Sequence, residues 1–181
     1  MEFSPDMGIS WSRTDALNDG KKTSLIQPTI LLHPGNNIQM LCRSMGTDIY
    51  SSWSADNGRS WDSFKSIGLP NPNTGIDAVT LKNGLQVLIY NHVANKKGKK
   101  WGDRNILNLA VSKDGLHREA AVLLENVPDV DSEYSYPAVI QSKDGLIHIT
   151  YTWNRKLIKH VVVDPNKIKS KPIQMGAWPK E

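Results

Sequence analysis

The stretches Ser4-Pro5-Asp6-Met7-Gly8-Ile9-Ser10-Trp11 and Ser54-Ala55-Asp56-Asn57-Gly58-Arg59-Ser60-Trp61 both follow the pattern S-x-D-x-G-x-x-W. Each residue type in the pattern has a role in a tight turn. The Asp can accept hydrogen bonds from the backbone of its own loop, and the Gly can adopt the positive φ that a tight hairpin needs. The Ser hydroxyl can form a hydrogen bond within the turn, and the Trp side chain can fold back and pack against the turn. Two copies at this spacing therefore indicate a repeated hairpin.

Between these turns the sequence consists of short alternating or β-branched runs, and no segment keeps a helical period for three turns. Three strand–turn–strand units are predicted, at 29–33 with 38–43, at 78–81 with 85–90, and at 137–141 with 146–151. A third strand follows each unit, at 48–53, 106–111 and 158–163. The second strands begin at 38, 85 and 146, which is a spacing typical of four-stranded propeller blades.

The repeated pattern resembles the Asp-box, the hairpin signature of sialidase-type β-propellers. From Ser24 to Asp164 the chain resembles the sialidase (neuraminidase) superfamily, most closely the bacterial and plant branch of BNR-repeat, neuraminidase-like proteins. The stretches that carry this resemblance are Ile26-Gln27-Pro28-Thr29-Ile30, Met40-Leu41-Cys42-Arg43-Ser44, Leu69-Pro70-Asn71-Pro72-Asn73-Thr74-Gly75-Ile76-Asp77 and Glu133-Tyr134-Ser135-Tyr136-Pro137-Ala138. The resemblance implies an all-β fold, a sialidase-type β-propeller fragment of roughly three to four antiparallel blades of an expected six.

The expected organisation follows from the repeats. Residues 1–23 are read as the end of a preceding blade with its Asp-box, 24–70 as a blade with an Asp-box, and 71–128 as a blade with a degenerate box at Ser112-Lys113-Asp114-Gly115-Leu116. Residues 129–170 are read as the final blade and 171–181 as a C-terminal tail. The chain is thus expected to be the C-terminal half of a ring, with open blade edges through which it could self-associate.

The amino-acid composition and charge of the chain argue against several classes of function. The chain has 181 residues, 39% hydrophobic and 22% charged, and a net charge of +4, as in an ordinary globular protein. The one basic cluster, Lys96-Lys97-Gly98-Lys99-Lys100, lacks interleaved aromatics, which argues against nucleic-acid binding. The lone Cys42 excludes an internal disulfide and lies in an apolar run where burial is expected. No metal-ligand spacing, membrane span or signal peptide is found, and no cofactor is expected.

The resemblance assigns two arginines to substrate binding. Sialidases of this fold hold the substrate carboxylate with three arginines, because a planar guanidinium offers paired donors to a carboxylate. Arg43 corresponds to the family's second arginine and Arg104 to its third. The first arginine and the acid/base Asp are expected in an N-terminal half outside this sequence. The alternative for Arg43 and Arg104 is a place in ordinary salt bridges on the blade surface.

Tyr134, followed by Ser135, matches the family's nucleophile segment. A phenol has a pKa of about 10 and therefore needs a nearby carboxylate to accept its proton. The family has a Glu-Pro step for this purpose, but this chain has Gln27-Pro28. Because Gln is neutral, general-base assistance worth about 10² to 10⁴ in rate would be lost. This substitution argues against ordinary sialidase chemistry.

Asp77 is the other candidate for acid/base work, since it ends a loop that enters an inner strand. Asn71 and Asn73 in the same loop carry amides suited to sugar hydroxyls, although a turn can be rich in Asn and Pro for backbone reasons alone. Glu133 is a poor candidate because neighbouring strand side chains point to opposite faces. His148 and His160 are expected to be packed strand residues. Arg155 is expected either to face the funnel or to lie at a hairpin tip.

The leading hypothesis is a carbohydrate-active protein that binds or hydrolyses the terminal acidic sugar of a glycan, in the manner of an exo-α-sialidase. One alternative is a non-catalytic glycan-binding propeller, and another is a propeller enzyme acting on a different uronate-bearing or deoxy-sugar glycan. A protein-interaction propeller would lack clustered arginines in its funnel. The fragment alone is expected to have little activity. The compartment stays open, with a secreted or periplasmic full-length protein as one option.

Overall fold

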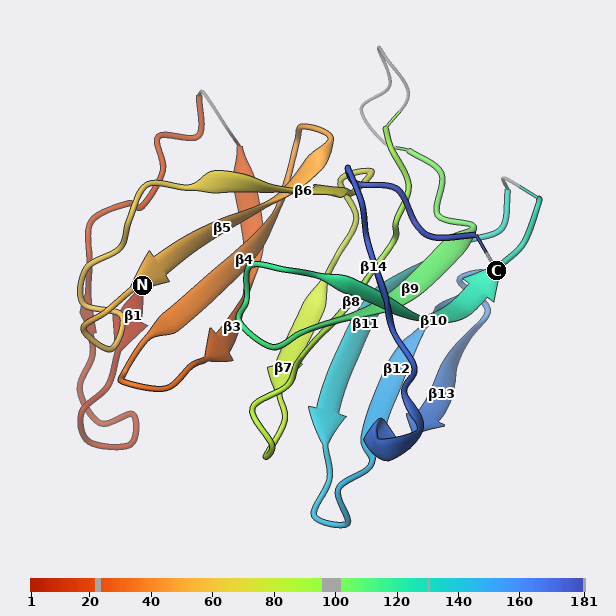
Figure 1. Cartoon of the computed structure of the whole chain (residues 1–181). Coiled ribbons are helices and arrows are strands. Elements are labelled where there is room, and N and C mark those ends of the chain that lie inside the picture. The colour runs from red at the N-terminus through yellow and green to blue at the C-terminus, as the bar shows by residue number, and fades with distance from the viewer. Residues whose placement is uncertain (22–23, 96–101, 130, 181) are drawn as a thin grey trace.

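The computed structural model describes residues 1–21, 24–95, 102–129 and 131–180. In these residues the chain is all-β, and Figure 1 shows its sheets arranged side by side around inner strands. The first sheet is a short hairpin of β1 (Glu2–Phe3) and β2 (Ser12–Arg13). The second is a four-stranded antiparallel sheet of β3 (Leu25–Leu32), β4 (Ile38–Ser44), β5 (Asp48–Ser54) and β6 (Lys65–Pro70).

The third sheet has the order β14-β10-β9-β8-β7 and is formed by β7 (Asp77–Thr80), β8 (Gln86–Tyr90), β9 (Ile106–Ser112), β10 (Glu119–Asn126) and β14 (Lys171–Pro172). The fourth sheet contains β11 (Tyr134–Gln141), β12 (Ile147–Trp153) and β13 (Leu157–Val163). A 3₁₀ turn at Pro165–Lys167 leads into the tail. This architecture confirms the predicted all-β fold of antiparallel sheets.

Both full Asp-boxes form the turn that their residue types predict. In the second box the N–H of Gly58 donates to Ser54 Oγ at 2.8 Å, and Asp56 accepts both the N–H and the hydroxyl of Ser60, at 2.8 and 2.6 Å. The Trp61 indole N–H donates to the Gly58 carbonyl at 2.8 Å. In the degenerate box Asp114 accepts from the backbone of Leu116 and His117, and the His117 ring lies 2.6 Å from its second oxygen.

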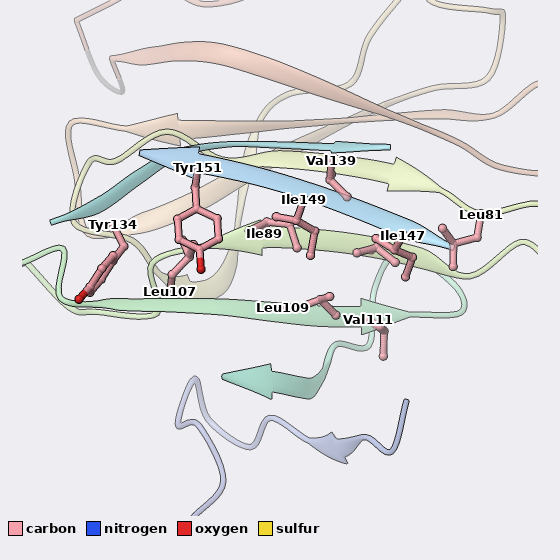
Figure 2. Packing of buried hydrophobic residues seen from close by; sticks show 11 residues of the cluster. Leu81, Ile89, Leu107, Leu109, Val111, Tyr134, Val139, Ile147, Ile149 and Tyr151 are labelled. Atoms are coloured by element: carbon pink, nitrogen blue, oxygen red, sulfur yellow. The ribbon is translucent and has the colours of Figure 1, made fainter. Parts of the chain in front are cut away.

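Apolar residues pack between the sheets rather than within them. The largest cluster lies between the third and fourth sheets, where side chains from β8, β9, β11 and β12 point toward one another (Figure 2). A second cluster, with Leu31, Ile49 and Leu88 among its members, joins the second and third sheets. A smaller one contains Cys42, whose burial is as predicted and raises the pKa of its thiol to about 12. No helix in the described residues is long and apolar enough to cross a membrane.

The first strands of the three larger sheets, β3, β7 and β11, lie next to one another, with β7 in the middle. Asp77 at the start of β7 joins all three. Its Oδ1 accepts the hydroxyl of Thr29 on β3 at 2.9 Å, and its Oδ2 accepts the N–H of Val139 on β11 at 2.8 Å. Of these inner strands, β11 begins at the site described next.

The tail extends the third sheet, which the sequence did not predict. β14 pairs with β10 in the register Glu119↔Pro172 and Ala120↔Lys171, and the Ile173 N–H donates to the Arg118 carbonyl at 3.2 Å. Ile173 and Trp178 then pack on the cluster between the second and third sheets. Figure 1 shows this tail, in blue, running beside β10. The tail is thus part of the folded body.

Candidate functional site

A pocket of about 480 Å³ lies where the loop before β9, the start of β11 and the turn after β12 meet. It is lined by Gly102, Asp103, Arg104, Asp131, Ser132, Glu133, Tyr136 and Arg155. All the side chains that line it, apart from the tyrosine ring, are charged or a small hydroxyl. Such a lining suits a ligand that is itself rich in hydrogen-bonding groups.

Glu133 is the centre of this pocket. Its Oε1 accepts from Arg104 Nη1 at 2.9 Å and from the Ser135 hydroxyl at 2.8 Å, while its Oε2 pairs with Arg155 Nε at 2.7 Å. Burial acts to raise the pKa of Glu133, but the hydrogen bonds from Ser135 and Arg155 and the charge of Arg104 outweigh it. The net pKa of Glu133 is lowered, so the group is an ionised acceptor between two guanidinium groups.

Arg104 is held in place by backbone contacts on both sides. Its carbonyl accepts the Tyr134 N–H at 2.9 Å, in a bridge that pairs Arg104 with Glu133. Just before it, the Gly102 N–H donates to the Pro72 carbonyl at 3.2 Å. A Cβ on Gly102 would lie 2.4 Å from the Pro72 Cβ, so only glycine lets the two loops approach this closely. The Arg104 side chain is 14% exposed and is therefore restrained on the pocket wall.

Arg155 lies in the β12–β13 hairpin turn. Asn154 and Arg155 both have positive φ, 51° and 52°, as both central residues do in a type I′ turn. The turn is fastened to Glu133, whose N–H donates to Asn154 Oδ1 at 2.7 Å and whose carbonyl accepts the Asn154 N–H at 2.7 Å. The Arg155 side chain is 72% exposed and reaches the pocket from the solvent side. Arg155 thus lies at a hairpin tip, which was one of the two expectations, and this tip lines the pocket.

Tyr136 presents its ring to the pocket, and Tyr134 does not. Tyr136 is 52% exposed and has the Arg104 guanidinium carbon 5.9 Å from its ring centre. Tyr134 is 3% exposed and belongs to the cluster between the third and fourth sheets, where its ring lies 6.3 Å from that of Trp153. Figure 2 shows Tyr134 at one end of this cluster. The pocket therefore contains a phenol, but not the one that the motif points to.

Gln27 and Tyr136 occupy corresponding positions on β3 and β11. Each has a positive φ, 53° and 51°, each precedes a proline, and each lies in a β-bulge where the strand pairing skips two residues. Proline has no N–H for the ladder, which is why it fits a bulge. Both side chains are exposed. Gln27 does not line the pocket.

The structure places the remaining predicted residues outside this pocket. Arg43 is 6% exposed and its Nη1 donates to the Asn73 carbonyl at 3.2 Å, so it holds the 71–76 loop and does not line the pocket. Asn71 is fully buried, and its amide closes an Asx turn with Thr74. Asn73 is fully buried as well, with its amide against Met45 Sδ. The loop approaches Tyr136 through its glycine, since a Cβ on Gly75 would lie 3.2 Å from the Tyr136 ring.

Asp77 does not face the pocket, because both of its oxygens are used between the inner strands. His148 and His160 stack with ring centres 5.2 Å apart on β12 and β13. The run 96–100 lies outside the described residues. Among the described residues, no three His, Cys, Asp or Glu side chains come together to hold a metal ion. Arg104 is thus the one assigned residue that the pocket contains, joined by Glu133, Tyr136 and Arg155.

Residues 1–149 match the family model of the BNR repeat-like domain. The chain belongs to this family. A search of curated protein sequences gives no match. The predicted BNR-repeat membership is therefore confirmed by the family model.

Among solved structures, a K499G mutant of the NanB sialidase of Streptococcus pneumoniae is similar, with a TM-score of 0.68, 16% identity, and coverage of 92% of this chain and 27% of that one. The intramolecular trans-sialidase of Ruminococcus gnavus is also similar, with a TM-score of 0.67 and 15% identity, and the match covers 94% of this chain and 39% of that one. The GH43 endo-arabinanase of Bacillus licheniformis has a TM-score of 0.54 and 20% identity, and the match covers 80% of this chain and 52% of that one. At these identities the likeness shows a glycosidase-like propeller fold. The chain spans about a quarter of the length of the NanB sialidase.

Proposed function

We propose that this BNR repeat-like chain is the glycan-recognition part of a sialidase-like protein, and that its pocket binds the carboxylate of a terminal acidic sugar. The observation that carries the proposal is the convergence of Arg104 and Arg155, from opposite sides, on one pocket beside the exposed ring of Tyr136. Paired guanidinium donors match a carboxylate in geometry as well as in charge. The tyrosine ring offers a face for the sugar ring.

Recognition in this pocket depends on directed hydrogen bonds more than on net charge, because Asp103, Asp131 and Glu133 line it together with the two arginines. Glu133 orients both guanidinium groups and leaves their other N–H donors for a ligand. The additional carboxylates are suited to accept sugar hydroxyls. Such a pocket favours an acidic sugar over a simple anion.

We extend this proposal from binding to hydrolysis of the bound sugar by an exo-α-sialidase mechanism. In it, Tyr136 replaces Tyr134 as the candidate nucleophile, since it is the phenol that is open to the pocket. Arg43 and Asn73 then act indirectly, by holding the loop against which Tyr136 packs.

A non-catalytic glycan-binding propeller is the second candidate, and one observation favours it. The carboxylates that the sequence offers as bases are already engaged: Glu133 by two arginines and Ser135, and Asp77 by Thr29 and Val139. Because Gln27 is neutral, this chain supplies arginines that can bind the carboxylate of a ligand more readily than it supplies a general base. Whether a longer protein adds the base is a separate question from binding.

The test compares binding of N-acetylneuraminic acid with binding of its methyl ester by titration calorimetry. We expect the ester to bind at least tenfold more weakly, because a neutral ester cannot pair with two guanidinium groups. Arg155→Ala should weaken acid binding about tenfold or more, and Arg59→Ala, an exposed arginine in the second Asp-box, should have no effect. Equal affinity for acid and ester, or no effect of Arg155→Ala, would contradict the proposal.

Hydrolysis is tested separately with a fluorogenic sialoside. Turnover that disappears in Tyr136→Phe and persists in Tyr134→Phe would support Tyr136 as the nucleophile. Absence of turnover, combined with tight binding of the acid, would favour the binding propeller.

A further inference from the structure

A small concavity of about 130 Å³ lies where the C-terminal tail crosses β10. The strand contributes small and apolar side chains, and the chain after the 3₁₀ turn contributes the rest. The lining residues are Ala120, Ala121, Leu123, Lys169, Lys171, Trp178, Pro179 and Lys180. None of these residues lines the pocket of Arg104 and Arg155. The volume is below the range for a drug-sized ligand, so it suits one charged group of a larger molecule.

The concavity is positively charged. All of its charged lining residues are lysines, namely Lys169, Lys171 and Lys180, and their side chains are exposed. Residues 165–180 contain four lysines and no Asp or Glu, and the only acid after Asp164 is the terminal Glu181. Among the described residues, none of the three lining lysines has a carboxylate within ion-pair distance. Like charges without counter-charges repel one another, and a bound anion relieves that repulsion.

The strand register keeps Glu119, the acid at the start of β10, away from these lysines. Lys171 pairs with Ala120, and Pro172 pairs with Glu119. Because neighbouring side chains of a strand point to opposite faces, Lys171 and Glu119 lie on opposite faces of the sheet. Glu119 accepts the hydroxyl of Ser170 and lines a different pocket together with it. The face that carries the lysines therefore keeps its charge.

Three separate ammonium groups favour a tetrahedral oxyanion over a carboxylate. A lysine ammonium is a compact point charge with three rotatable donors, and it lacks the planar paired donors with which arginine matches a carboxylate. A sulfate or phosphate ester has three terminal oxygens that point in different directions, so it can accept from several lysines at once. Trp178 and Pro179 add an apolar wall, and the Trp178 ring is restrained by an edge-to-face contact with His92, with ring centres 5.3 Å apart.

We propose that this concavity binds the sulfate or phosphate ester of a sugar, with the oxyanion among Lys169, Lys171 and Lys180 and the sugar ring against Trp178. The choice of a sugar as the carrier rests on the proposed glycan-binding function, whereas the choice of the oxyanion rests on the lysines. The protein would then bind glycans at two places that differ in chemistry, with arginines for a carboxylate and lysines for an ester anion.

The experiment follows the amide and indole N–H chemical shifts of the full chain by NMR during addition of glucose 6-sulfate, glucose 6-phosphate, glucuronate or glucose. We expect shifts at residues 169–171 and at the Trp178 indole, with dissociation constants for the esters on the order of millimolar. Glucuronate and glucose should bind there at least tenfold more weakly. Binding of one ester alone would support the proposal and identify the anion. Raising NaCl from about 0.05 to 0.5 M should weaken ester binding at least fivefold, since salt screens exposed charges.

Substitutions of the exposed lysines test the site without endangering the fold. Lys171→Ala should weaken ester binding at least fivefold, and Lys169→Ala should act in the same direction. Lys171→Arg keeps the charge and should change the affinity by less than about twofold. Lys167→Ala is the matched control, because Lys167 is an exposed lysine of the same segment that does not line the concavity and lies 3.9 Å from Asp164. It should leave ester binding unchanged.

Arg155→Ala separates this proposal from the proposed function, and it should leave ester binding unchanged. Loss of ester binding in Arg155→Ala but not in Lys171→Ala would place the esters in the arginine pocket and overturn the proposal. Equal affinity for glucose and its esters would overturn it as well, and so would binding of a single-stranded oligonucleotide without binding of either ester. Failure of N-acetylneuraminic acid to bind would bear only on the arginine pocket.

Discussion

The carboxylate of Asp77 on β7 accepts the backbone N–H of Val139 on β11 at 2.8 Å. Its other oxygen accepts the Thr29 hydroxyl on β3, so one side chain fastens three inner strands. Each inner strand belongs to a different sheet, and β11 begins at the pocket of Arg104 and Arg155. The Asp77 side chain, an acid/base candidate in the sequence, thus clamps the inner strands together.

Asp77→Ala should lower the free energy of unfolding by about 1–3 kcal/mol, because it leaves the Val139 N–H without its acceptor and leaves the Thr29 hydroxyl only the longer bond to the Ala78 carbonyl, at 3.3 Å. Asp77→Asn keeps one acceptor oxygen and should cost roughly half as much. Urea denaturation followed by circular dichroism measures both. Asp62→Ala, at an exposed aspartate, is the control and should change stability by less than about 0.5 kcal/mol. Equal effects at the two positions would refute the clamp.

The Asp-box aspartates predict a loss of stability in acid. Hydrogen bonds from Ser60 and Ser54 lower the pKa of Asp56 to about 2, and the pKa values of Asp6 and Asp114 are lowered as well. A carboxylate whose pKa is lower when folded stabilises the fold above its unfolded pKa of about 3.9, and this contribution disappears as pH falls toward the folded value. We therefore expect the melting temperature to fall between pH 4 and pH 2.

Asp56→Asn should flatten this pH dependence, since an amide does not titrate. Thermal unfolding at half-unit pH steps from 2 to 6 measures the slope for the unaltered chain and the variant. Parallel slopes would mean that the Asp56 carboxylate does not contribute to acid sensitivity.

The two Asp-box tryptophans should differ in their effect on stability. Trp61 packs against the cluster of Leu25, Met40 and Cys42, whereas Trp11 is 65% exposed. Trp61→Ala should cost about 2–4 kcal/mol because it opens a gap beside buried side chains. Trp11→Ala should cost less than about 0.5 kcal/mol. The denaturant midpoints of the two variants measure this difference. A larger loss of stability in Trp11→Ala than in Trp61→Ala would contradict the observed packing.

His92 should make the attachment of the tail sensitive to pH. Burial lowers its pKa, although the hydrogen bond with the Gly176 carbonyl, at 2.9 Å, opposes this shift. A histidine with a lowered pKa when folded stabilises the fold above its unfolded pKa of about 6.5, and that contribution decreases as pH falls below it. Backbone hydrogen exchange at 171–178 should therefore become faster between pH 7 and pH 5, after correction for intrinsic rates. His92→Phe should remove this dependence, and an unchanged dependence would argue against His92 as its source.

Much of the fold could be predicted from local signals. The Asp-box turns were predictable because Ser54, Asp56, Gly58 and Trp61 bond within a few residues of each other. The strands at 38–43, 85–90 and 106–111 were predictable from their apolar runs. The outer strands were harder to locate, since Glu119–Asn126 reads EAAVLLEN, a composition that also suits a helix, and only pairing with β9 makes it a strand.

The site was less predictable, because it depends on where two bulges turn the side chains. A motif places Tyr134 and Tyr136 close together in sequence, but the bulge between Ser135 and Ala138 decides that Tyr136 is exposed and Tyr134 buried. Glu133 lies in the pocket while its neighbour Tyr134 is buried in the core, as strand alternation predicts, and its side chain pairs with Arg104 and Arg155.

The pairing of β14 with β10 has a consequence for how the chain acquires its structure. Residues 119–120 can complete their hydrogen bonding only after the whole of the fourth sheet has been synthesised and β14 returns to them. Contacts between segments so far apart along the chain form slowly, because the loop between them must close first. Folding during translation would therefore end with the docking of the tail onto β10.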